Sequence, residues 1–159
     1  MKKTIMTSLI ATVFLTAAPA FASTTDNVMI IDSWVRAAPQ SAKVQAAFFT
    51  FMNHNQEPIV LTGVKATGFG HSELHLSSKK DGVMTMEQQQ KITIPANTIF
   101  KFKPGGYHVM LMQPEQIAAP GEMVKLTFNL VSGETITAEM PVKRDNNKMQ
   151  MDHSKMKHD

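Results

Sequence analysis

The segment "GGYHVMLM", residues 105–112, combines a strand pattern with an unusual set of side chains. Side chains alternate between the two faces of a β-strand. One face of this segment is therefore ordinary core material: Tyr107, Val109 and Leu111. The other face carries an imidazole and two thioethers: His108, Met110 and Met112. The segment predicts a strand that packs its first face into the protein and offers soft ligand atoms on its second.

Short strands are predicted along most of the chain, because its apolar runs are brief, β-branched or aromatic, and interrupted by Pro, Gly and Asn. The expected strands are 28–36, 44–53, 59–66, 72–78, 83–89, 98–103, 107–112, 124–131 and 135–142. Turn signals such as Asp81-Gly82, Pro120-Gly121 and Ser132-Gly133 separate several of them. Strands at this spacing predict an all-β fold, an antiparallel Greek-key sandwich or barrel.

The first 22 residues are predicted to be a secretory signal peptide. Lys2 and Lys3 precede the apolar run "IMTSLIATVFLTAA", and Ala20-Phe21-Ala22 matches a cleavage signal. The apolar run is shorter than the ~20 residues that a membrane span needs. We therefore expect a mature chain in the periplasm without a membrane span. It would consist of a β-sandwich domain, residues 23–143, and a flexible tail, residues 144–159.

The composition excludes several classes of function. Without Lys2 and Lys3 the chain has 14 basic and 13 acidic residues, so nucleic acid is not an expected partner. Cysteine is absent, which rules out disulfides, thiolate catalysis and a blue-copper centre. The sequence has neither a G-x-S-x-G motif nor paired carboxylates in a suggestive setting. We do not expect an enzyme.

A hairpin predicted around Asp81-Gly82 adds to the His/Met face. With these two residues as the loop, His75 faces Gln88 across the hairpin, and Met86 lies diagonally from His75 on the same face. Diagonal cross-strand neighbours lie ~7–8 Å apart, within reach of two long side chains. Together with two residues of 107–112, this geometry predicts a two-nitrogen, two-sulfur ligand set: His75, Met86, His108 and Met110.

Such a set favours monovalent copper. Thioethers are soft and neutral and bind Zn, Mg or Ca weakly, whereas Cu(I) favours them. A Met/His site also avoids the oxidation that a thiolate would suffer in an exported compartment. The residues therefore predict reversible Cu(I) binding.

The spacing of these four residues resembles the H-x10-M-x21-H-x-M signature of the periplasmic copper chaperones called PCuAC. The resemblance also covers "SWVRAAP" (33–39), "ELH" (73–75), "DGVMTM" (81–86) and "KPGGYHVMLM" (103–112). One departure is Leu76, at a position where the family often has Met. The resemblance implies a cupredoxin-like β-sandwich. It also implies Cu(I) delivery to the CuA centre of a respiratory oxidase, often alongside a Sco-like thioredoxin-fold protein.

Other residues near these motifs have more ordinary interpretations. Met84 and Met112 share the parity of the expected ligands and are interpreted as neighbours of the site or as core, with direct contact to the metal as the less favoured alternative. Packing roles are expected for Trp34 and Tyr107. A surface loop is expected at His71 and a turn at His54. Core positions are expected for four further methionines: Met29, Met52, Met123 and Met140.

The tail contains a second cluster of soft and borderline ligands: Met149, Met151, His153, Met156 and His158. Biased His-containing tracts often bind metal, and this polar segment offers no core in which methionine would be buried. The methionines favour Cu(I), whereas the histidines and Asp152 also accept Cu(II). The tail is therefore predicted to be a second copper site.

Two alternatives to delivery remain open from the sequence. A periplasmic copper-sequestering protein for copper tolerance would need the same ligands and would differ only in what accepts the ion. A metal-free interaction module would present the Met-rich surface directly to a partner.

Overall fold

The computed structural model describes residues 25 and 27–145, and the regular elements in this part of the chain are all β-strands. The strands are β1 Val28–Arg36, β2 Val44–Asn53, β3 Ile59–Ala66, β4 Phe69–Lys80, β5 Val83–Gln88, β6 Ile92–Ile94, β7 Thr98–Phe102, β8 Tyr107–Pro114, β9 Met123–Leu130 and β10 Thr135–Lys143. The all-β prediction is confirmed. The short strand β6 was missed because three residues are too few to show an alternating pattern.

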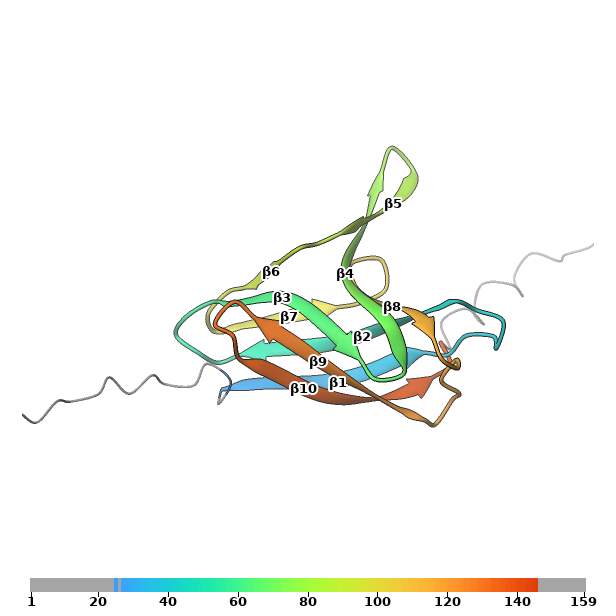
Figure 1. The fold of residues 1–159 in the computed structure, drawn as a ribbon. Helices are drawn as coiled ribbons and strands as arrows, with labels where there is room; N and C mark the ends of the chain where they lie inside the picture. The colour runs from blue at the N-terminus through green and yellow to red at the C-terminus, as the bar shows by residue number, and fades with distance from the viewer. Residues whose placement is uncertain (1–24, 26, 146–159) are drawn as a thin grey trace, which may run out of the picture.

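The ten strands form one continuous hydrogen-bonded sheet, which divides into two parts, here called the first and the second sheet, joined along one seam (Figure 1). In the first sheet the order is β5-β4-β8-β2-β1, and β7 also pairs with β2. The second sheet has the order β10-β9-β3-β6. The seam is a parallel pairing of β1 with β10, at Val35 with Val142 and Arg36 with Lys143. The spacing of the predicted strands indicated antiparallel pairing and gave no sign of this parallel contact.

The core lies between the two sheets and takes alternate residues from their strands. Phe49 of β2 is at its centre, with ring centroids 4.2 Å from Phe102 and 5.0 Å from Phe128. Val109 and Leu111 of β8 are fully buried in the same cluster. The inward face predicted for β8 is therefore confirmed, which leaves His108, Met110 and Met112 on the outward face.

The four methionines expected in the core have three different outcomes. Met52 of β2 is only half-buried and is not part of the core cluster of the described residues. Met140 is completely buried and belongs to the core. The core prediction was wrong for Met29 and Met123, which are 53% and 55% exposed. Each lies next to an inward-facing residue, Met29 beside Val28 and Met123 beside Val124, and strand alternation therefore turns both outward.

The β4–β5 hairpin extends away from the body of the molecule (Figure 1). Its register is set by a two-residue loop, Asp81 and Gly82, with φ angles of 52° and 84°. Both values lie in the left-handed region that a type I′ turn requires. In the described residues no helix is long and apolar enough to cross a bilayer.

Candidate metal centre

The two histidines of the expected ligand set are direct neighbours across two strands. β4 pairs antiparallel with β8, and His75 is opposite His108. Their ring centroids are 5.9 Å apart. The next pair on the same face is Glu73 with Met110. Pairing of strands that are distant in sequence therefore places two imidazoles and one thioether together on the outer face of the first sheet.

The hairpin brings the fourth expected ligand to the same face. His75 is opposite Gln88 and Ser77 is opposite Met86, so Met86 lies diagonally from His75 as the turn predicted. Met86 is 54% exposed. The hairpin therefore places a solvent-exposed thioether on the same face as His75, diagonal to it.

A small surface pocket of about 170 Å³ lies at this position. It is lined by Arg36, Ala46, Phe48, Ser77, Met86, Pro104, Gly105, His108 and Met110. Three of the four expected ligands thus line one pocket. His75 is not part of the lining and lies beside it, next to His108. The volume of the pocket suits a single ion together with a few ligand atoms.

The surroundings of His108 fix which of its nitrogens is free. Its Nδ1 lies 2.9 Å from the backbone oxygen of Gly106, and a carbonyl oxygen can only accept, so Nδ1–H is the donor. Nε2 then carries the free lone pair. Burial lowers the pKa of His108, the hydrogen bond to Gly106 partly opposes this shift, and the charge of Arg36 lowers the pKa further. The neutral imidazole, which is the form that binds metals, is therefore favoured.

Glu73 holds His75 in the other tautomer, with the proton on Nε2 instead of Nδ1. Its carboxylate lies 2.6 Å from His75 Nε2 and 2.7 Å from His71 Nε2. The hydrogen bonds to His75 and His71 lower the pKa of Glu73, so the carboxylate is ionised and accepts from both rings. His75 Nδ1 is buried and has no hydrogen-bond partner within the described part of the chain. A buried nitrogen with a free lone pair is suited to a metal bond.

An arginine forms one wall of the pocket. The guanidinium carbon of Arg36 lies 4.9 Å from the ring centroid of Phe48 and 5.8 Å from that of Trp34, and Arg36 Nη2 is 2.8 Å from Asp145 Oδ2. Trp34 packs on Phe48 with centroids 4.9 Å apart. The packing role expected for Trp34 is confirmed. Tyr107 also packs as expected, against Phe100 and Phe102.

Sequence reasoning missed Glu73, Arg36 and Phe48. Glu73 is two residues from His75, so strand alternation alone could have predicted that both side chains lie on the same face. Arg36 and Phe48 come from β1 and β2, and no local pattern links them to residues 75–110. Only the strand order brings them to the pocket.

The surface loop predicted at His71 is wrong. β4 begins at Phe69, and His71 is a strand residue opposite Met112. The pairing with β8 extends the strand beyond its apolar part. The expected exposure of His71 is correct, since its side chain is 56% exposed. Met84 and Met112 do not line the pocket, and Met84 pairs instead with Lys79 near the hairpin tip.

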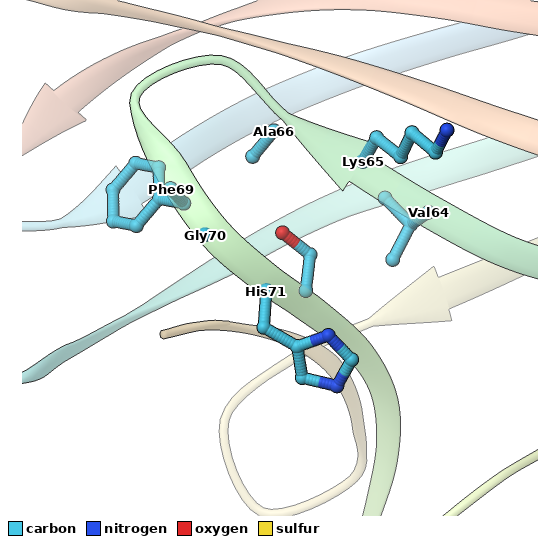
Figure 2. Close-up of a pocket in the computed structure, with 7 residues that line it drawn as sticks. Val64, Lys65, Ala66, Phe69, Gly70 and His71 are labelled. Atoms are coloured by element: carbon cyan, nitrogen blue, oxygen red, sulfur yellow. The ribbon is translucent and has the colours of Figure 1, made fainter. Parts of the chain in front are cut away.

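A second pocket, of about 360 Å³, lies between β3 and β4 (Figure 2). Val64, Lys65 and Ala66 line it from β3, and Phe69, Gly70, His71 and Ser72 line it from β4. None of the four expected ligands lines this pocket. In residues 25 and 27–145, no three side chains of His, Asp or Glu are grouped so that they could hold a metal ion. The ligands expected in the tail, Met149 to His158, and the expected signal peptide, residues 1–22, lie outside the described residues.

Residues 28–142 match the LpqE-like family, described as putative lipoprotein LpqE-like. The protein Lxx21020 of Leifsonia xyli is 29% identical over 119 residues, which cover 74% of this chain and 70% of that protein. The protein RP573 of Rickettsia prowazekii is 26% identical over 102 residues, 64% of this chain and 56% of its own length. The names of the family and of the Leifsonia protein contain the word lipoprotein.

Solved structures with the same fold include PCuAC domains. Apo-DR1885 from Deinococcus radiodurans is 26% identical with a TM-score of 0.60, and the match covers 92% of this chain and 98% of that one. CuI-DR1885 is 29% identical with a TM-score of 0.59, covering 72% and 76%. The copper-bound PCuAC domain from PmoF2 is 20% identical with a TM-score of 0.63, covering 75% and 94%. These neighbours confirm the cupredoxin-like fold and the resemblance to PCuAC domains.

Proposed function

Because the chain belongs to the LpqE-like family and has the fold of PCuAC domains, we propose that it is a periplasmic copper chaperone that binds Cu(I) through His75, Met86, His108 and Met110. The observation that carries the proposal is the meeting of these four residues at one face. His75 and His108 are opposite each other, and Met86 is diagonal to His75. Met110 is two residues from His108 on the same face of β8. The copper-bound neighbours CuI-DR1885 and the PmoF2 domain support the choice of metal.

The hydrogen bonds of the two histidines support a choice of ligand atoms. His108 would bind through Nε2, because its Nδ1–H is donated to Gly106. His75 would bind through Nδ1, because its Nε2–H is donated to Glu73. With both imidazoles in their neutral forms all four ligands are uncharged, so Cu(I) would enter without displacing a proton, and the ion with its four ligands would carry one positive charge. Glu73 acts as a positioning residue, in the carboxylate–histidine–metal arrangement that fixes a ligand's tautomer.

The exposure of the site supports delivery. Met86 is 54% exposed on a projecting hairpin, whereas His108 is only 4% exposed. An incoming ligand from an acceptor can therefore replace Met86 first, while His108 and Met110 still hold the ion. As acceptor we propose the CuA centre of a respiratory oxidase, alone or with a Sco-like protein. The tail cluster, Met149 to His158, would supply a second site for Cu(I) or Cu(II).

The test is an anaerobic competition titration with Cu(I) and a chromogenic chelator. The intact protein should bind one ion tightly, and Met110→Leu, which keeps the volume but removes the sulfur, should weaken binding by at least about tenfold. The matched control is Met123→Leu, an exposed methionine on the second sheet, which should bind copper as the parent does. Equal affinity in all three proteins would refute this ligand set.

A transfer experiment separates delivery from sequestration. The Cu(I)-loaded protein is mixed with an apo CuA domain, and the copper content of each is measured after separation. A delivery protein should lose its ion to the CuA domain. Retention of copper at equilibrium would instead favour a sequestering role in copper tolerance.

A further inference from the structure

The outer face of β4 and β8 continues beyond the four proposed ligands. Two residues along each strand from Glu73 and Met110, His71 is opposite Met112. Alternate residues share a face, so these two lie on the same face as the proposed copper site. The row therefore consists of three cross-strand pairs: His75 with His108, Glu73 with Met110, and His71 with Met112.

Core packing does not account for Met112. In the described part of the chain, the hydrophobic cluster and the residues packed against it include Val109 and Leu111 of β8 but not Met112. Its neighbour on β2 is Val44, which is 41% exposed. A half-buried thioether on an outward face adds little to the core, whereas its sulfur remains available as a soft ligand.

His71 is prepared for metal binding in the same way as His75. One carboxylate oxygen of Glu73 lies 2.7 Å from His71 Nε2 and the other lies 2.6 Å from His75 Nε2. His71 Nε2–H therefore donates, and Nδ1 carries the free lone pair. Unlike His75, His71 is largely exposed, and it lines the pocket between β3 and β4 (Figure 2).

Met110 lies within reach of both ends of the row. Successive same-face residues of a strand are about 6.6–6.8 Å apart, and opposite residues have Cβ atoms about 4.5–5.5 Å apart. Methionine is unbranched and has three rotatable side-chain bonds, so its sulfur can cover such a distance by rotation. An ion held between His71 and Met112 can therefore also contact the sulfur of Met110.

We propose that His71 and Met112 form an outer Cu(I) site from which Met110 carries the ion to and from the inner site. This inference rests on the proposed function of the inner site. In the transfer step the Met110 sulfur stays bound while His71 and Met112 release the ion. His75, His108 and Met86 then complete its coordination. Copper remains Cu(I) throughout and every ligand is neutral, so neither an electron nor a proton is transferred.

The test uses the full chain labelled with ¹³C at the methionine methyl groups and ¹⁵N at the histidine rings, titrated anaerobically with Cu(I). The first ion should move the methyl signals of Met86 and Met110. Excess Cu(I) should then move the Met112 methyl signal and the ring nitrogens of His71. Met84 is an internal control, because it is 58% exposed and pairs with Lys79 rather than with a histidine.

Kinetics with matched variants complete the test. Met112→Leu should abolish the response of His71 and slow Cu(I) removal by a chelator severalfold, with the inner-site affinity unchanged. Met84→Leu should match the parent in both. If Met86 and Met110 respond to copper but Met112 and His71 do not, and the removal rate is unchanged, the outer site does not exist while the chaperone proposal stands. If Met86 and Met110 do not respond, the proposed function itself fails.

Discussion

At the scale of single residues, the site depends on hydrogen bonds that hold each imidazole in one tautomer. Gly106 accepts from His108 Nδ1, and Glu73 accepts from His75 Nε2. One ring therefore presents Nε2 and the other Nδ1. Two neutral rings held this way are ready to bind Cu(I) without reorganisation, which lowers the cost of ordering the site when the ion arrives.

Glu73→Gln tests the positioning role. The amide can still accept a hydrogen bond, but it lacks the charge that fixes the His75 tautomer. We expect Cu(I) affinity to fall by about 10–100-fold, the usual effect of losing such a partner. The ¹⁵N shifts of His75 should also show a mixture of tautomers in the apo protein. Unchanged shifts and affinity would show that Glu73 does not position His75.

The lowered pKa of His108 makes the stability of the apo protein depend on pH. Burial depresses the pKa of His108 in the folded state, whereas the unfolded chain has the ordinary value near 6.5. The unfolded state therefore binds more protons as the pH falls. The stabilisation is fully present above the unfolded pKa and is lost as the pH falls through the folded pKa.

Urea denaturation at a series of pH values measures this dependence. The free energy of unfolding should decrease as the pH is lowered below about 6.5, because His108 must stay neutral in the folded protein. In His108→Phe this component should be absent, and the decrease over that interval should be smaller. Identical pH profiles for the two proteins would contradict the buried, neutral state assigned to His108.

At the scale of elements, the β4–β5 hairpin decides where Met86 lies. The loop residues Asp81 and Gly82 both have positive φ angles, and the register places Met86 opposite Ser77. A shift of the register by one residue would turn Met86 to the other face of the hairpin. The turn therefore controls one of the four proposed ligands, although its own residues do not line the pocket.

Gly82→Val should weaken copper binding while most of the fold stays intact. A Cβ at this position meets no other atom within 4 Å, so the cost is conformational: φ is +84° and a β-branched residue resists that value. We expect lower Cu(I) affinity with a nearly unchanged melting temperature. Gly82→Asn is the matched control, since Asn tolerates the left-handed region, and it should bind copper much as the parent does. Normal affinity in Gly82→Val would show that the turn does not set the site.

At the scale of the whole molecule, one face of the first sheet contributes to stability and the other carries the proposed copper site. The inward face supplies the core, in which Phe49 contacts Phe128 of the second sheet. The outward face carries the proposed ligands. Stability and copper binding should therefore respond to different substitutions.

Phe128→Ala tests this separation. Removing a fully buried phenylalanine should lower the free energy of unfolding by about 3–5 kcal/mol, as measured by guanidinium denaturation. In conditions where the variant remains folded, its Cu(I) affinity should equal that of the parent. A large loss of affinity in the folded variant would show instead that the core and the site are coupled.

The sequence by itself determined the all-β fold, the hairpin register and the facing positions of His75, Gln88 and Met86. These follow from alternation and turn chemistry, which act over a few residues. Only the tertiary structure decided which strand lies beside β4. That pairing places His75 opposite His108 and His71 opposite Met112, and strand order places Arg36 and Phe48 at the pocket. Contacts between strands distant in sequence depend on how the two sheets share one core, and no local pattern encodes that.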